Sequence, residues 1–99
     1  QTVARYAQAI ESRDMAAVRT VYPAITPQQQ LRFQQFFDAT RTLNVTFGIA
    51  NLRIDGDLAE ARLTGTYEYE TERGRSEDPV DFTANLRREA NGWRLVSVR

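Results

Sequence analysis

The hydrophobic pattern of this chain changes its period once, near residue 42. Before that point apolar residues such as Val3, Tyr6 and Ile10 recur every three or four positions, which predicts an amphipathic helix. After it, apolar and polar residues alternate, which predicts strands with one buried face. The pattern therefore predicts an α+β domain in which all helices precede all strands.

Local signals divide residues 1–41 into three helices. Asp14 is a predicted N-cap for the second helix, which Pro23 ends. Thr26-Pro27 predicts the start of a third helix that runs to about Asp38. On that helix Leu31 lies nearly opposite Phe33, so we expect one of the two to face a cavity or a partner.

Residues 42–99 predict four antiparallel strands. The apolar phase slips after Ile49, and a β-bulge near Ala50-Asn51 would restore one common apolar face. Asp55-Gly56-Asp57 is a turn signal. Residues 73–78 are interpreted as a polar turn region, with Pro79 as the first residue of the next strand.

The last hairpin determines which polar groups point inward. A two-residue turn at Asn91-Gly92 would pair Ala90 with Trp93, and this register places Arg88 and Ser97 on the inner face. Polar groups buried there would need a carboxylate, water or a ligand. The alternative is that the strand end frays and Arg88 extends to solvent.

The same register places two apolar side chains on the outer face. Val96 lies opposite Arg87, and Val98 lies opposite Asn85. We interpret these four residues as a candidate dimer interface or a contact with the rest of a longer chain, because apolar residues on both faces indicate a covered strand. Two exposed valines are the alternative.

Composition excludes several classes of function. Thirteen basic and thirteen acidic residues balance, which argues against binding to nucleic acid or an anionic membrane. The chain contains no Cys and no His, which excludes zinc sites and thiol or imidazole catalysis within it. We also expect no other metal site and no cofactor. No apolar run approaches the roughly 20 residues that span a bilayer. The chain opens in a helical pattern without Met, so residues 1–99 are expected to be one domain of a longer protein.

Four segments resemble the nuclear transport factor 2-like superfamily, and together they cover nearly the whole chain. These segments are Tyr6–Ile10, Ser12–Val18, the strand Val45–Ile54 with its turn, and Asn91–Leu95. The superfamily includes SnoaL-like and ketosteroid isomerase-like proteins. The resemblance implies three helices packed in the concave face of a strongly curved four-stranded antiparallel sheet, a cystatin-like cone with a pocket.

The resemblance also implies a range of functions, because some members are enzymes and many are non-catalytic binding or dimerisation modules. The pattern is most similar to accessory domains of bacterial membrane-anchored protein kinases and envelope proteins. This implies a bacterial origin and suggests a periplasmic or other extracytoplasmic location, with the cytoplasm not excluded.

We therefore predict a non-catalytic ligand-sensing or protein-interaction module of a larger protein. Its ligand would be a small molecule or peptide with a carboxylate. An isomerase or cyclase that uses Tyr6 and a cavity carboxylate is one alternative, and a structural dimerisation domain is the other. The predicted pocket residues are Tyr6, Tyr22, Phe33, Phe37, Phe47, Tyr67, Arg88, Trp93 and Ser97.

Overall fold

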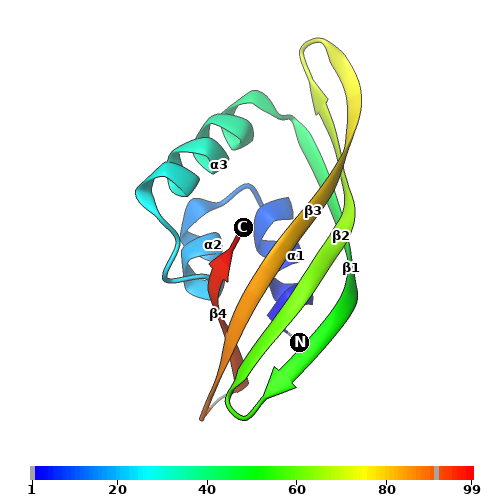
Figure 1. The fold of residues 1–99 in the computed structure, drawn as a ribbon. Coiled ribbons are helices and arrows are strands. Elements are labelled where there is room, and N and C mark those ends of the chain that lie inside the picture. The colour runs from blue at the N-terminus through cyan, green and yellow to red at the C-terminus, as the bar shows by residue number, and fades with distance from the viewer. Residues whose placement is uncertain (1, 91) are drawn as a thin grey trace.

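Three helices are followed by four strands, in the predicted order. The computed structural model describes residues 2–90 and 92–99. The elements are α1 (Thr2–Glu11), α2 (Met15–Val21), α3 (Pro27–Ala39), β1 (Thr42–Asp55), β2 (Leu58–Thr71), β3 (Gly74–Glu89) and β4 (Gly92–Val98). The strands form one antiparallel sheet in the order β1-β2-β3-β4. This sheet is curved and unclosed, and the helices pack against one of its faces (Figure 1).

The predicted helix starts are confirmed by their capping bonds. The Asp14 carboxylate accepts a hydrogen bond from the amide of Ala16 at 3.0 Å. Thr26 and Gln29 form a reciprocal capping box at the start of α3, where Pro27 is the first helical residue. Each helix therefore begins where a side chain satisfies its free backbone amides.

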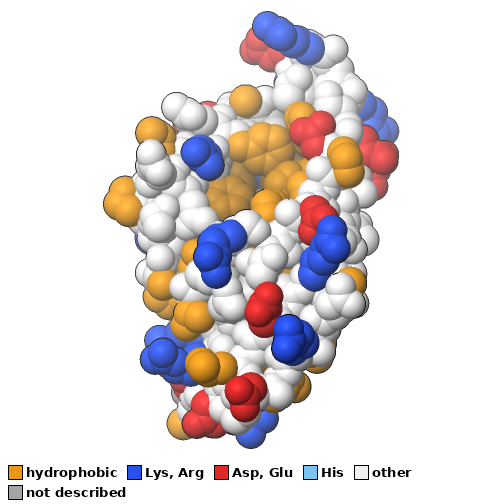
Figure 2. All heavy atoms as spheres, in the orientation of Figure 1, with side chains coloured by type: hydrophobic (Ala, Val, Ile, Leu, Met, Phe, Trp, Pro, Cys, Tyr) orange, Lys and Arg blue, Asp and Glu red, His pale blue; other side chains and the backbone are white. Residues whose placement is uncertain are grey.

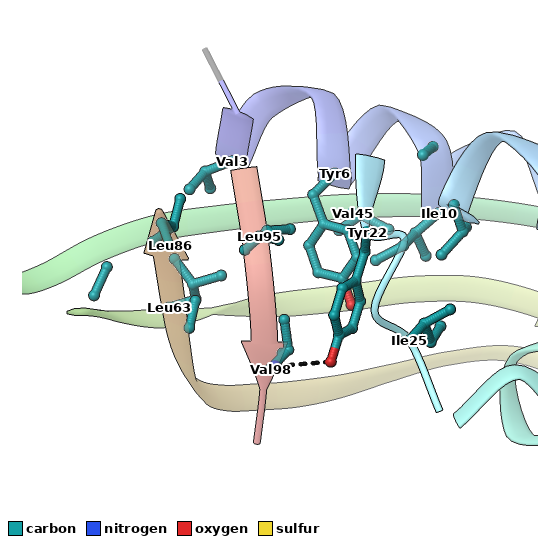
Figure 3. Close-up of a cluster of buried hydrophobic side chains, with 14 of the residues drawn as sticks. Val3, Tyr6, Ile10, Tyr22, Ile25, Val45, Leu63, Leu86, Leu95 and Val98 are labelled. Atoms are coloured by element: carbon teal, nitrogen blue, oxygen red, sulfur yellow. Dashed lines mark hydrogen bonds between the residues drawn. The ribbon is translucent and has the colours of Figure 1, made fainter. Parts of the chain in front are cut away.

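The core lies between α1, α2 and the inner face of the sheet. Ile10, Val18, Leu63 and Leu95 are fully buried and come from four different elements. The Tyr22 hydroxyl accepts a hydrogen bond from the backbone amide of Val98 at 3.1 Å (Figure 3). This contact fixes the end of the helical layer against the last strand.

The predicted bulge in β1 is confirmed. The pairing of β1 with β2 shifts between Ala50 and Arg53, and Asn51 has a positive φ of 53°. Leu52 and Ile54 nevertheless remain more than half exposed, because the described helices do not cover this end of the sheet. Both side chains border a shallow apolar groove beside Val3.

The interpretation of residues 73–78 as a turn is wrong. β2 continues to Thr71 and β3 already begins at Gly74, so only two residues separate the strands. Pro79 lies inside β3 opposite Thr66 and does not begin the strand. A proline is tolerated at this position because the C-terminal segment pairs with β3 only from Thr83 onward, which leaves the other edge of β3 free at Pro79.

The predicted register of the last hairpin is also wrong. Asn91 lies outside the described residues, but Gly92 pairs with Glu89 and Trp93 pairs with Arg88, so Trp93 does not face Ala90. Further along, the register shifts again and leaves Val96 unpaired. A second bulge in the sheet therefore lies in β4.

The bulge at Val96 reverses the faces of the residues that follow it. Val98 is 5% exposed and belongs to the core, so its predicted outer-face position is wrong. Ser97 pairs with Asn85 on the outer face and accepts a hydrogen bond from that amide at 2.9 Å, so its predicted inward position is wrong. The bulge thereby buries a valine and gives the serine hydroxyl a partner.

Gly65 marks a close approach of β2 to β1. A Cβ atom at Gly65 would lie 1.7 Å from the carbonyl oxygen of Thr46, whereas a Cβ at Gly48 would be 3.7 Å from its nearest neighbour. Both glycines occupy strands and have no positive φ. The two positions therefore differ mainly in the space available for a side chain.

We predict that Gly65→Ala lowers the free energy of unfolding by about 1–3 kcal/mol, because the strands must separate to admit the methyl group. Gly48→Ala is the matched control and should change stability by less than about 1 kcal/mol. Urea denaturation of both variants measures the difference. Equal stabilities of the two variants would contradict the close approach at Gly65.

Candidate ligand-binding site

A cavity of about 330 Å³ lies between α3 and the inner face of the sheet. Figure 2 shows it as a hollow whose interior is apolar, with both basic and acidic side chains near its rim. The cavity is lined by Tyr6, Gln29, Arg32, Phe33, Phe36, Tyr67, Phe82, Val98 and Arg99. The fold therefore contains a hollow between α3 and the sheet.

Aromatic rings form the walls of the cavity and support one another. Tyr6 on α1 stacks against Phe47 on β1, with ring centroids 5.9 Å apart. Phe36 on α3 stacks against Tyr67 on β2 at 5.8 Å, and Tyr67 contacts Phe82 on β3 at 6.5 Å. Rings in mutual contact hold one another in place, so the walls are preorganised.

Two phenol groups are available to a ligand. Neither the Tyr6 nor the Tyr67 hydroxyl has a hydrogen-bond partner among the described residues. Burial raises the pKa of both phenols well above 10, and the nearby Tyr67 and Tyr22 raise the pKa of Tyr6 further. Both groups are therefore protonated near neutral pH and can donate hydrogen bonds.

Gln29 joins α3 to the last strand at one side of the cavity. Its side-chain oxygen accepts hydrogen bonds from the Thr26 amide at 3.1 Å and from the Tyr22 hydroxyl at 3.3 Å. Its side-chain nitrogen donates to the Val98 carbonyl at 2.9 Å. Because both ends of the amide are engaged, Gln29 holds the cavity wall in place.

Two guanidinium groups lie at the mouth of the cavity, where it opens to solvent. The Arg32 and Arg99 side chains are exposed, and neither forms an ion pair or a side-chain hydrogen bond with any described residue. No Asp or Glu is among the described lining residues. Asp78, on the inner face of β3, lies outside this lining and accepts a hydrogen bond from the Tyr69 hydroxyl at 2.6 Å. Neither guanidinium group at the mouth therefore has an ion-pair partner among the described residues.

The described residues have no group of three acidic side chains that could hold a metal ion. None of the helices seen in residues 2–90 and 92–99 is both long and apolar enough to cross a membrane.

No family model and no curated protein matches the sequence. Solved structures do match its fold. A provisionally named dehydratase of the nuclear transport factor 2-like family from Streptomyces avermitilis is 16% identical, with a TM-score of 0.78 over 98% of this chain and 87% of its own. A nuclear transport factor 2-like protein with a cystatin-like fold from Novosphingobium aromaticivorans is 19% identical, with a TM-score of 0.69 over 98% and 74%.

The chain has the nuclear transport factor 2-like fold. A third structure with this fold is a provisionally named calcium/calmodulin-dependent protein kinase type II association domain from Thiobacillus denitrificans. It is 17% identical, with a TM-score of 0.75 over 99% of this chain and 89% of its own. The TM-scores confirm the predicted architecture, whereas identities this low leave the function of this chain to be argued from its own residues.

The predicted pocket residues fall into three groups in the nuclear transport factor 2-like cone. Tyr6, Phe33 and Tyr67 line the cavity. Phe47 lies behind the Tyr6 ring, whereas Tyr22 and Phe37 are buried in the core. Arg88, Trp93 and Ser97 do not line it.

Arg88 and Trp93 contact each other elsewhere on the sheet. The Arg88 guanidinium lies 4.8 Å from the centre of the Trp93 ring, and the arginine side chain is exposed. Trp93 is half-buried and borders the shallow groove near Val3. Arg88 therefore extends to solvent, as the alternative prediction had it, and its predicted place in the pocket is wrong.

Several lining residues were absent from the predicted pocket. Gln29, Arg32, Phe33 and Phe36 have the helical spacing i, i+3, i+4 and i+7, so the period of α3 alone could have placed all four on one face. Val98 and Arg99 could not have been found in this way, because their faces depend on the bulge at Val96.

Burial of the Tyr6 phenol makes stability depend on alkaline pH. The folded pKa is raised above the ordinary value of 10.0, so the stabilisation is complete below pH 10 and is lost as the pH rises further. We predict a fall in the free energy of unfolding of up to about 1.4 kcal/mol per pH unit above pH 10 from this group. Tyr6→Phe should decrease more slowly in free energy of unfolding above pH 10, and urea denaturation at a series of pH values measures this. The same pH dependence in Tyr6→Phe and the wild type would contradict the prediction.

The dimer interface stays a prediction for Val96, Asn85 and Arg87, whereas the burial of Val98 removes that residue from it. If two copies pack through this outer surface, Val96→Asp should convert the dimer to a monomer, because it places a charge in the interface. Light scattering measures the mass, with Arg75→Asp on the distant β2–β3 hairpin as a control. An unchanged dimer mass for Val96→Asp would rule this interface out.

Proposed function

We propose that this chain is a non-catalytic ligand-binding module that senses a small, largely apolar molecule on behalf of a larger protein. The observation that carries the proposal is the cavity of about 330 Å³ with five aromatic residues in its lining. Pockets that hold small organic molecules are mostly apolar and contain a few well-placed polar groups. The two phenols and two arginines are such groups.

Acid–base catalysis has little support from the residues present. An isomerase or cyclase that uses Tyr6 would need a carboxylate base beside that phenol, and the described lining contains none. The chain also lacks His and Cys. Because burial raises the pKa of both phenols, neither acts as a base near neutral pH. The dehydratase name belongs to a protein only 16% identical to this one.

A purely structural dimerisation domain has less support than a binding module. An apolar cavity in a folded domain lowers its stability, because the lining atoms lose packing contacts. A module that only dimerises gains nothing from such a space. Retaining a cavity of this size therefore favours a ligand that fills it.

The size of the cavity limits the ligand. At ordinary packing density about 330 Å³ holds roughly a dozen non-hydrogen atoms. Two fused aromatic rings with one small substituent fit this limit and can stack between Phe33, Tyr67 and Phe82. Naphthalene-2-carboxamide is a neutral probe of this shape.

We predict that naphthalene-2-carboxamide binds the protein and that Phe33→Ala weakens its affinity about fivefold, because one aromatic wall is lost. Isothermal titration calorimetry measures the affinity, and thermal unfolding checks that the variant is folded. Leu31→Ala on the same helix is the matched control, since Leu31 is 59% exposed and lies outside the cavity lining. Equal affinities of the two variants, or no binding of flat aromatic probes at all, would overturn the proposal.

A further inference from the structure

We infer that the cavity selects an aromatic carboxylate, with its ring among the aromatic side chains and its carboxylate between Arg32 and Arg99. This inference rests on the proposed function and specifies the ligand class of the same site. It arises from the combination of an apolar interior with two free cations at the mouth. A neutral hydrocarbon could not form an ion pair with either of these cations.

The two arginines lie on α3 and at the end of β4, two elements that are hydrogen-bonded to each other at one side of the cavity. Arg32 belongs to α3, between the lining residues Gln29 and Phe33, whereas Arg99 directly follows β4. A group at this side of the mouth can therefore be contacted by both guanidinium groups. Guanidinium groups match the planar, two-oxygen geometry of a carboxylate better than a point charge does.

Both arginines are anchored through their backbones. Arg99 donates a backbone hydrogen bond to the Thr83 carbonyl at 2.9 Å, and its own carbonyl accepts one from the Thr83 amide at 2.7 Å. The first turns of α3, which carry Arg32, are tied to β4 by the Gln29–Val98 hydrogen bond. The distance between the two backbones is thus fixed, and only the side chains must order when a ligand binds.

The nearby acidic groups already have partners. Asp78 accepts the Tyr69 hydroxyl, and Asp81 forms an ion pair with Arg62 on the outer face. Neither carboxylate lines the cavity. An incoming carboxylate therefore meets two cations in the lining, whereas the charge of Asp78 lies outside it and that of Asp81 is paired with Arg62.

The two ends of the cavity favour one orientation of the ligand. A carboxylate near the buried Tyr6 would lose most of its hydration, and phenols are neutral donors that compensate only part of this loss. A carboxylate at the mouth keeps contact with water and pairs with guanidinium groups. The charged end therefore lies at the mouth, and the ring occupies the interior beside the phenols.

The experiment compares naphthalene-2-carboxylate with naphthalene-2-carboxamide, which have the same ring and differ in charge. Calorimetry at low ionic strength should show that the wild type binds the carboxylate about tenfold more tightly than the amide. Arg32→Gln and Arg99→Gln should each weaken carboxylate binding about threefold, and the double variant should remove the preference. Amide binding should stay unchanged in all three variants.

Arg75→Gln is the matched control, because it removes the same charge from an exposed position of β3 that lies outside the cavity lining. It should leave both affinities unchanged. Equal loss of carboxylate binding in Arg75→Gln and Arg32→Gln would mean that net charge acts at long range, and the inference would be wrong. Equal wild-type affinities for the two probes would also overturn it while leaving the proposed function intact. Failure of both probes to bind would overturn the proposed function itself.

Discussion

The hydrogen bond between the Val98 amide and the buried Tyr22 hydroxyl connects the two layers of this domain. It fixes the end of β4 beneath the helices, and Gln29 extends the connection to α3 through the Val98 carbonyl and the Tyr22 hydroxyl. The cavity lies between these connected elements. Its shape therefore depends on the position of the last strand, since one wall comes from α3 and another from the sheet.

Curvature of the sheet leaves the space that the rings line. Gly65 has no side chain on the inner face, so β1 and β2 can approach closely at that point. Its neighbours in register are Phe47 and Val80, and the Phe47 and Phe82 rings meet edge to face at 6.3 Å beside this gap. Aromatic side chains that cover a glycine in this way stabilise a bent sheet. The same bend keeps the rings on one concave surface, where a ligand can reach them.

Most of the fold could be predicted from the sequence because its signals are local. The change of period near Thr42, the caps at Asp14 and Thr26, and the bulge near Asn51 all appear in short stretches. Residues 73–78 were wrongly interpreted as a turn, because a hairpin that is exposed on both faces carries polar residues at every position, as a turn does. The β4 bulge could not be predicted either. Apolar residues occupy both parities from Trp93 to Val98, so the pattern permits either face until Tyr22 and Asn85 supply partners.

The candidate site was only partly predicted, because part of its lining depends on the β4 bulge. Sequence reasoning left Arg88 either inside the cone or extended to solvent. A guanidinium without a partner is too costly to bury, and Arg88 lies exposed over the Trp93 ring, as the second alternative predicted. The bulge at Val96 has the opposite effect on the end of the chain, because it directs Val98 into the core and brings Arg99 to the cavity. The positive charge therefore lies at the edge of the apolar space, where water still reaches it. Such a site can pair with an anion without first burying its own cations, so charge recognition at the mouth and ring stacking in the interior remain separate contributions to binding.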